Sequence, residues 1–257
     1  MNRILPLEGI HNFRDYGGYG VAGGGRVVRG GLWRSGEHGG ASADDLATVA
    51  ALDLATVIDL RGNSERANSP CRRPDDFAAE VIFHDGETAG LALHVEAAEG
   101  VLSEADARRA MERLYREIPF RERLIPVLRR YFAALAEREG PSLVHCLAGK
   151  DRTGLAVALL HHALGVSRDD AMADYLLTNT AGNIERRIAA GGEAIRARHG
   201  GIDDATIQVL MGVEEHYLAA SLAAIEARYP SVDAYLADVL GVDNALRGKL
   251  REQLIEG

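Results

Sequence analysis

The stretch LVHCLAGKDRTGLAVALL, residues 143–160, runs from apolar residues through a short polar cluster into a second apolar run. The first run, within PSLVHC, predicts a short buried strand, and the second, within TGLAVALLHHALG, predicts a helix that Gly165 terminates. Open α/β sheets bind ligands at the carboxyl ends of their strands, which is where the polar cluster lies. The amide groups at a helix N-terminus carry partial positive charge, so this junction is suited to hold a dianion such as phosphate.

A cysteine opens the polar cluster, and an arginine follows six residues later. The loop N–H groups and Arg152 are expected to stabilise the thiolate form of Cys146, which makes it a nucleophile. Arg152 can donate to two phosphate oxygens, and Thr153 can donate to the Cys146 sulfur and ease its departure. These groups meet the needs of in-line phosphoryl transfer without a metal ion. The expected phosphate-binding residues are Leu147, Ala148, Gly149, Lys150, Asp151 and Arg152.

On both sides of this stretch, strand patterns alternate with helical ones. The further predicted strands are LWRS (32–35), ATVIDLRG (55–62) and AEVIFHDG (79–86). Strands separated by helices indicate an α/β fold with a mainly parallel central sheet and helices on both faces. The segment SADDLATVAAL (42–52) is a predicted helix in which Ser42 and Asp45 form a capping box.

Helical periodicity also covers residues 103–138, with a break near Pro119 and Pro126, and continues to the last segment, NALRGKLREQLIE (244–256). We therefore expect one catalytic domain over residues 1–257. Its core would be about 1–165, and residues 166–257 would form an all-helical extension. The charged, amphipathic residues 94–118 suggest a helical lid over the cleft, the alternative being a plain pair of surface helices.

Composition limits the possible partners and locations. A net charge of −9 argues against broad binding to nucleic acid or anionic membranes. No window reaches the roughly 18 apolar residues of a membrane span, and the N-terminus lacks the apolar core of a signal peptide. We expect a cytoplasmic protein without stable membrane insertion and, by default, a monomer; signal-independent export would leave no mark in the sequence. With only Cys71 and Cys146, disulfides cannot be the stabilising framework.

The loop HCLAGKDRTG resembles the C-x5-R-[ST] signature of the cysteine-dependent protein tyrosine phosphatases, in the version found in bacterial tyrosine-phosphatase-like proteins that also act on phosphoinositides. Four further stretches match the same subfamily, so the resemblance covers most of the chain. They are NFRDYGG (12–18), LWRSGEH (32–38), VIDLRGNSER (57–66) and YLAASLAAIEARYPSVDAYLADVLG (217–241). The resemblance implies a metal- and cofactor-independent phosphatase that forms a phosphocysteine on Cys146. Its substrates would be phosphorylated proteins or phosphoinositides.

Three aspartates compete for the role of proton donor, since the familiar tryptophan-proline-aspartate loop is absent. Asp151 lies within the phosphate loop, and the resemblance implies that an aspartate there can serve as the acid. Asp85 follows a predicted strand, at the position in chain order where dual-specificity phosphatases carry theirs. We favour Asp151 and expect activity to peak on the acidic side, because the acid must be protonated to act. Asp59 is expected to orient Arg61 or the phosphate loop.

Other candidate residues support the site. Lys150 could pair with a further phosphate at the rim, as in lipid phosphatases with the loop HCxAGKxRTG, or be a solvated loop lysine. His145 could orient the loop or be satisfied by the backbone at the strand end. Arg14 and Asp15 could brace the loop or fix a glycine-rich turn. Cys71 could form a protective disulfide with Cys146 or be an ordinary free thiol.

Two rival functions use similar features. A rhodanese-like sulfurtransferase also carries a cysteine on a strand-to-helix loop, but that loop is typically shorter. A catalytically inactive phosphate-binding module would be expected to lose its nucleophile, and Cys146 is present. GYGVAG (18–23) matches the glycine pattern of dinucleotide-binding sites, but no strand precedes it and no helix follows, so we assign it no cofactor. His161 and His162 lack zinc-site spacing, so we predict no metal site.

Overall fold

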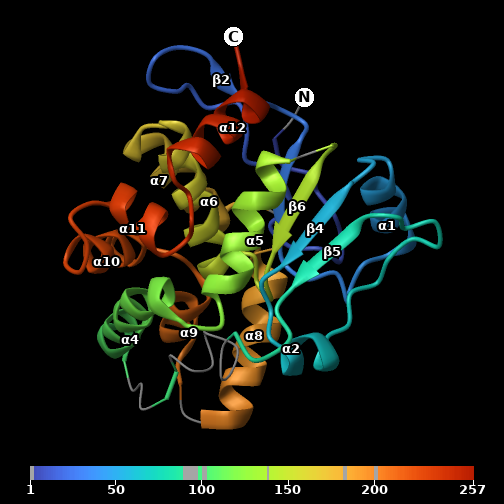
Figure 1. Ribbon diagram of the computed structural model, residues 1–257. Coiled ribbons are helices and arrows are strands. Elements are labelled where there is room, and N and C mark those ends of the chain that lie inside the picture. The colour runs from blue at the N-terminus through green and yellow to red at the C-terminus, as the bar shows by residue number, and fades with distance from the viewer. Residues whose placement is uncertain (1–2, 89–97, 100–102, 138, 182–183, 200–201) are drawn as a thin grey trace.

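A five-stranded sheet forms the centre of the computed structural model, which describes residues 3–88, 98–99, 103–137, 139–181, 184–199 and 202–257. The strand order is β1-β3-β6-β4-β5, and every neighbouring pair is parallel except β1 with β3 (Figure 1). The strands are β1 (Arg14–Asp15), β3 (Leu32–Ser35), β6 (Ser142–His145), β4 (Thr56–Asp59) and β5 (Glu80–Phe83). The predicted α/β class with a mainly parallel sheet is therefore confirmed.

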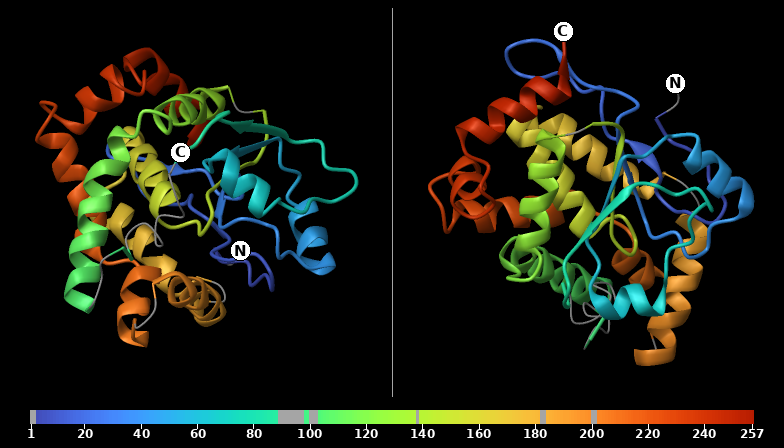
Figure 2. Two further views of the ribbon diagram at one scale, coloured as in Figure 1. Left: turned by 90° about the horizontal axis from the view of Figure 1, so that it is seen from below. Right: turned by 45° about the vertical axis from the view of Figure 1, so that its right-hand side comes forward.

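Alternation along the strands divides the core between the two faces of the sheet. Leu32, Ile58 and Val144 belong to the larger apolar cluster, which includes α5 (Ile125–Ala136) and α6 (Asp151–Leu164). Their neighbours in sequence, Trp33, Val57 and Leu143, belong to a smaller cluster with the N-terminal segment and α1 (Ala43–Ala50). Helices thus cover both faces, as expected, but most of them lie on one side (Figure 2).

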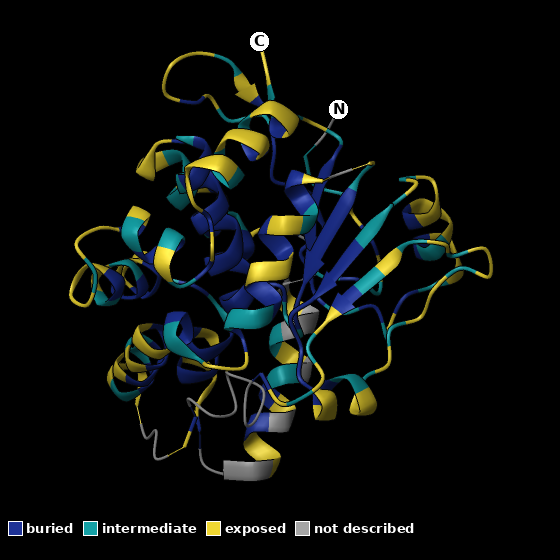
Figure 3. Ribbon diagram, in the orientation of Figure 1, coloured by how far each residue is buried: buried dark blue, intermediate teal, exposed yellow. Residues whose placement is uncertain are grey.

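The strand ends are in register where the site begins. Ser35 of β3 and Asp59 of β4 both pair with His145 of β6, so the three strands end at the same level. Helix α6 follows β6 after a short loop and is buried along nearly its whole length, as Figure 3 shows. Gly165 ends it with φ of +87°, a left-handed conformation that favours glycine. A fully buried strand and a helix that is buried along nearly its whole length therefore meet at the loop 146–150.

The remaining predicted helices are present, with the expected capping box of Ser42 and Asp45 at α1. The break expected near Pro119 and Pro126 falls between α4 and α5, where Pro119 lies in a short 3₁₀ segment and Pro126 in the first turn of α5. The other elements are α2 (Asn63–Asn68), α4 (Glu104–Glu117), α7 (Arg168–Leu176), α8 (Ile184–His199), α9 (Asp204–Met211), α10 (Glu215–Glu226), α11 (Val232–Asp238) and α12 (Asn244–Leu254).

The C-terminal extension differs from the expectation in two respects. It is not all-helical, because α12 ends at Leu254 and β7 (Ile255–Glu256) pairs with β2 (Arg26–Val27) near the start of the chain. It also shares the larger apolar cluster with the sheet, since α12 packs against α5 and α6 and α10 packs against α4. The segment proposed as a lid lies partly outside the described residues. Its described parts are 98–99 and 103–118, the latter containing α4, and its role as a lid stays a prediction.

Candidate active site

The loop between β6 and α6 folds tightly against the end of β3. Gly149 has φ of +65°, and a Cβ atom built there would lie 2.3 Å from the backbone oxygen of Ser35. The amide of Glu37 donates to the carbonyl of Leu147 at 3.0 Å. The loop therefore packs against the segment LWRSGEH, which is one of the stretches that resemble the family. Only glycine satisfies both the backbone conformation and the close approach at position 149.

Several backbone amides at the start of α6 and in the loop before it are left without an acceptor among the described residues. No side chain caps this helix, and across the described part of the chain the amides of Leu147, Gly149 and Arg152 donate to no protein acceptor. An uncapped helix N-terminus with a preceding turn of free N–H groups is a ready anion site. A Cβ atom on Gly154 would lie 2.9 Å from the ring of Tyr175, so this glycine makes room for α7.

Cys146 is the first residue of the loop, with 2% of its surface exposed, and it is a free thiol. Arg152 is the second residue of α6 and is also 2% exposed. Its Nη1 and Nη2 donate to the two carboxylate oxygens of Glu65 at 2.5 and 2.6 Å. Burial acts to lower the pKa of Arg152, but Glu65 outweighs it, and Cys146 and Asp151 add to the rise. The guanidinium is therefore held charged within electrostatic reach of the sulfur.

The remaining face of the Arg152 guanidinium is available to a ligand. Its Nη1 also donates to the carbonyl of Leu60 at 3.2 Å and contacts the hydroxyl of Thr88 at 3.1 Å. Its Nε is buried and has no partner among the described residues. Thr153 Oγ1 is likewise buried without a described partner, so the expected hydrogen bond from Thr153 to Cys146 is not formed here. Buried donors without acceptors are rare, and an anion bound in the loop would satisfy such a donor.

The two candidate acids lie in different environments. Asp151 is 3% exposed, and its Oδ1 accepts a hydrogen bond from the hydroxyl of Tyr115 at 2.8 Å. Asp85 is exposed at the carboxyl end of β5 and accepts from the side-chain amide of Asn63 at 2.9 Å. Of the two, only Asp151 directly follows the phosphate loop in sequence and accepts a hydrogen bond from a neighbouring helix.

The structure brings His145, Asp59 and Arg61 together beside the loop. Arg61 donates to both oxygens of Asp59, with Nε to Oδ1 at 2.9 Å and Nη2 to Oδ2 at 2.8 Å. Burial acts to raise the pKa of Asp59, but His145 and Arg61 outweigh it and lower that pKa to about 2. His145 Nε2 lies 3.7 Å from Asp59 Oδ2, and its Nδ1 lies 3.2 Å from the carbonyl oxygen of Cys146. Asp59 thus orients Arg61, as the sequence suggested.

Arg14 reaches the loop through an intermediary, whereas Asp15 does not reach it. The guanidinium of Arg14 contacts the side-chain oxygen of Asn12, whose amide nitrogen donates to the carbonyl of Gly149 at 2.7 Å. Asp15 instead accepts from the amides of Gly17 and Gly30, so it fixes the glycine-rich turn. Of the two roles left open for this pair, Arg14 takes the first and Asp15 the second.

A buried aspartate on α7 joins this bracing group to the strands. Asp174 is fully buried and forms ion pairs with Arg14 at 3.4 Å and with Arg34 at 2.8 Å. Arg34 in turn donates to the carbonyl of Gly149 at 3.0 Å. Burial acts to raise the pKa of Asp174, but the two arginines outweigh it and lower that pKa to about 2. The phosphate loop is therefore fixed from behind by a charged cluster that includes the C-terminal extension.

Lys150 differs most from its expected position. It is fully buried, and its Nζ donates to the carbonyls of Leu210 at 2.6 Å and Gly212 at 3.0 Å, at the end of α9. The same Nζ lies 3.5 Å from Asp151 Oδ1. Carbonyl groups at a helix C-terminus lack partners within the helix and attract cations. The side chain is therefore neither a rim cation nor a solvated loop lysine; it ties the loop to the extension.

Cys71 lies near the site with its thiol already engaged. Its Sγ accepts from Nη2 of Arg61 at 3.1 Å and from the amide of His38 at 3.4 Å. Burial raises its pKa, although Arg61 acts in the opposite direction. Both cysteines are free thiols in the structure, and the disulfide stays one of the two alternatives.

The residues of the site that were not singled out from the sequence include Glu65, Asn12, Asp174 and Tyr115. Glu65 and Asn12 lie within quoted family stretches, so the motifs could have pointed to them. Asp174 and Tyr115 lie in helical segments without a local signal. Within the described part of the chain, no group of three histidine, cysteine, aspartate or glutamate residues is placed to hold a metal ion. No helix there is long and apolar enough to cross a membrane.

Comparison with known proteins agrees with this geometry. A Cupriavidus necator protein named as a candidate tyrosine-protein phosphatase is 37% identical over 254 residues, covering 95% of this chain and 87% of that protein. The triple specificity protein phosphatase PtpB of Mycobacterium tuberculosis is 31% identical, covering 98% and 99%. A tyrosine-protein phosphatase of Nostoc commune is 28% identical, covering 80% and 68%. The tyrosine phosphatase family model matches residues 5–256, and the chain belongs to this family of cysteine-dependent enzymes.

Proposed function

We propose that this enzyme hydrolyses phosphate monoesters through a phosphocysteine on Cys146, with Arg152 as the phosphate clamp and Asp151 as the proton donor. The observation that carries the assignment is the pairing of Arg152 with Glu65. It fixes the guanidinium beside the cysteine loop, and Nε has no acceptor among the described residues. A guanidinium held in one orientation can donate hydrogen bonds to two oxygens of a phosphate group.

The first step transfers the phosphoryl group to the enzyme. The Cys146 thiolate attacks phosphorus, the bond from phosphorus to the ester oxygen breaks, and Asp151 gives its proton to the departing oxygen. The loop amides and Arg152 neutralise charge on the three equatorial oxygens. Because these donors are already in place, little reorganisation is needed as the charge develops.

The second step returns the enzyme to its starting state. Water attacks the phosphocysteine, Asp151 accepts a proton from that water, and the sulfur leaves as a thiolate with release of inorganic phosphate. The hydroxyl of Thr153 can donate to the departing sulfur if it rotates from its present position, where it has no described partner. Asp85 is the alternative acid, but its exposed position beside Asn63 gives it no contact with the loop.

For the substrate, phosphotyrosine is the first candidate, since the chain belongs to the tyrosine phosphatase family. The name of one relative, a triple specificity protein phosphatase, supports a wider range that includes phosphoserine and phosphothreonine. Phosphoinositides remain a candidate from the loop resemblance alone, because the Lys150 side chain is occupied by α9 carbonyls. We also propose a cytoplasmic monomer.

Turnover of p-nitrophenyl phosphate in EDTA tests the assignment. We expect vanadate to inhibit it and Cys146→Ser to abolish it, whereas Cys71→Ser should retain turnover as a matched thiol control. Transfer of sulfur from thiosulfate to cyanide would instead identify a sulfurtransferase, and phosphate binding without turnover would identify an inactive module. A panel of phosphopeptides and phosphoinositides then defines the substrate class.

A further inference from the structure

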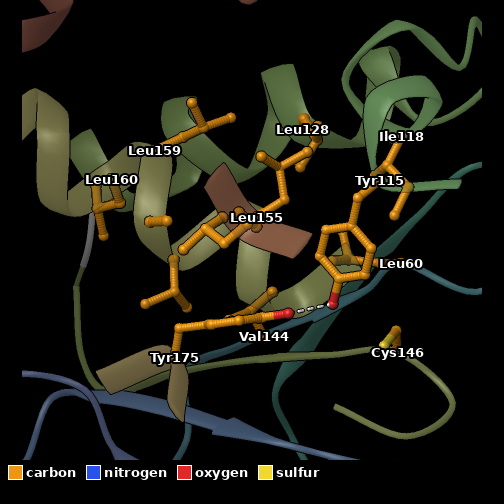
Figure 4. Packing of buried hydrophobic residues seen from close by; sticks show 14 of the residues in the cluster. Leu60, Tyr115, Ile118, Leu128, Val144, Cys146, Leu155, Leu159, Leu160 and Tyr175 are labelled. Atoms are coloured by element: carbon orange, nitrogen blue, oxygen red, sulfur yellow. Dashed lines mark hydrogen bonds between the residues drawn. The ribbon is translucent and has the colours of Figure 1, made fainter. Parts of the chain in front are cut away.

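Two buried tyrosine hydroxyls form a chain that ends on the carboxylate of Asp151. Tyr175 of α7 donates to the hydroxyl of Tyr115 at 2.7 Å, and Tyr115 of α4 donates to Asp151 Oδ1 at 2.8 Å. Figure 4 shows the two tyrosines approaching from different helices with their hydroxyls pointing at each other. Neither motif matching nor the phosphocysteine mechanism assigns a role to this chain.

The direction of the chain is fixed by the chemistry of its members. Tyr115 and Tyr175 are at most 1% exposed, and this burial raises the pKa of each well above 10. Both hydroxyls therefore stay protonated at any pH at which the enzyme would work. Since Tyr115 accepts from Tyr175, its single proton is directed to Asp151.

Packing restricts the movement of both hydrogen-bonded tyrosines, Tyr115 and Tyr175. The ring of Tyr217 lies 5.5 Å from that of Tyr115, and the ring of Tyr175 lies so near α6 that a Cβ atom on Gly154 would be 2.9 Å from it. A tyrosine has only two side-chain torsions, so rings packed in this way have little freedom to move. The hydroxyl of Tyr115 thus marks a fixed point for the Asp151 carboxylate.

The contacts divide the two oxygens of Asp151 between different tasks. Oδ1 accepts from Tyr115 and lies 3.5 Å from Nζ of Lys150. Oδ2 accepts no hydrogen bond from any residue in the described ranges. Holding one oxygen of a carboxyl group orients the other, which is then the oxygen available to carry a proton to the ester oxygen of a substrate.

We propose that Tyr115 is a positioning residue for Asp151 and that Tyr175 in turn positions Tyr115. These hydrogen bonds set the efficiency with which Asp151 protonates the leaving group. The inference rests on the proposed function, in which Asp151 is the acid. Leaving groups that need a proton, such as phenol or the tyrosine side chain, depend on the chain. Leaving groups that depart readily as anions do not.

The test is a series of aryl phosphates whose leaving phenols differ in acidity, from phenyl phosphate to 2,4-dinitrophenyl phosphate. Asp151→Asn should lower kcat/KM on phenyl phosphate by about 100-fold and leave the dinitrophenyl ester nearly unchanged. Tyr115→Phe should show the same selectivity with a loss of about tenfold, and Tyr175→Phe a loss of about threefold. Tyr131→Phe is the matched control, because it removes a buried hydroxyl that pairs with Tyr16 elsewhere in the core.

A double-mutant cycle separates positioning from general damage. In the Asp151→Asn background, Tyr115→Phe should change kcat/KM by less than about twofold on every ester, because its effect passes through the missing carboxyl group. An equal loss on all esters, or the same loss with and without Asp151, overturns the proposal. The proposal is also overturned if Tyr115→Phe and Tyr175→Phe both keep the wild-type dependence on the leaving group, or if Asp151→Asn keeps it. None of these results contradicts the phosphocysteine mechanism. Turnover that survives Cys146→Ser would instead overturn the proposed function and the proposal with it.

Discussion

The carboxylate of Glu65 accepts two parallel hydrogen bonds from the guanidinium of Arg152, one from each terminal nitrogen. Glu65 also accepts from the amide of Gly62 at the start of α2. Burial acts to raise the pKa of Glu65, but Arg152 outweighs it and lowers that pKa. The short helix α2 thus fixes the orientation of an arginine that lies 87 residues later in the chain.

Removing this partner should affect binding and stability together. Glu65→Ala leaves a buried guanidinium unpaired, which we expect to lower the free energy of unfolding by about 3–5 kcal/mol. A displaced Arg152 should also lower kcat/KM by about 100-fold. Urea unfolding and p-nitrophenyl phosphate kinetics measure the two effects. Glu65→Gln, which keeps one acceptor oxygen, should give intermediate values, and Glu80→Gln, at an exposed position of β5, should match wild type. Equal activity in Glu65→Ala and wild type would contradict the role of Glu65 in holding Arg152.

Gly149→Ala should disable the loop. Its φ of +65° disfavours a side chain, and the added Cβ would collide with the backbone of Ser35. Gly241→Ala is the matched control, because Gly241 has φ of +73° but open space around it. Both variants should lose about 1 kcal/mol of unfolding free energy from backbone strain. Only Gly149→Ala should also lose vanadate affinity and turnover, and similar kinetics in the two variants would show that the close approach is unimportant.

Asp174→Asn should loosen the loop without touching it. The substitution removes the negative charge between Arg14 and Arg34, both of which are fully buried. We expect a loss of about 3–5 kcal/mol in unfolding free energy at pH 7 and a lower kcat. Asp169→Asn, exposed on the same helix, serves as the control for both measurements.

The same residue predicts a pH dependence of stability. Because the folded pKa of Asp174 is about 2 and the unfolded value is about 3.9, its contribution is present above pH 4 and is lost as the pH falls toward 2. This contribution is about 2–3 kcal/mol. Unfolding free energy measured between pH 5 and 2 should therefore fall less steeply in Asp174→Asn than in wild type. Parallel curves would contradict the ion-pair assignment.

His38 should destabilise the fold in mild acid. Burial lowers its pKa to about 3, with His145 and Arg61 acting in the same direction. Between pH 6.5 and 3 the unfolded chain binds a proton that the folded chain does not. The free energy of unfolding therefore decreases as the pH is lowered, by up to about 1.4 kcal/mol per pH unit. His38→Gln should show a shallower slope over this range. His216→Gln, at an exposed position, should keep the wild-type slope, and an unchanged slope in His38→Gln would refute the assignment.

The elements and the nucleophile could be predicted from sequence because their signals are local. Short apolar and β-branched runs indicated β3, β4, β5 and β6, and the six-residue spacing from Cys146 to Arg152 carried the chemistry. The end of the chain was predicted wrongly, because helical periodicity in α12 continues past Leu254. The two-residue β7 is set by pairing with β2, which lies more than 200 positions earlier.

The supporting residues could not be predicted because tertiary packing brings them together. Tyr115 and Asp174 have no local pattern that distinguishes them from other helical residues. Their roles arise where α4 and α7 meet the loop. The orientation of Lys150 depends on the end of α9, so a lysine in a familiar motif was expected at the rim and is instead buried.

The ion pair between Arg14 and Asp174 joins residues 160 positions apart, and through Asn12 it supports the turn at Gly149 in the cysteine loop. During synthesis the sheet and the nucleophile leave the ribosome before α7 does. A nascent chain that ends after α6 would carry the complete signature motif but lack Asp174 and Tyr175. Such a chain would lack the ion pair and the hydrogen bond that α7 supplies, so the signature motif becomes fully braced only after α7 has been made.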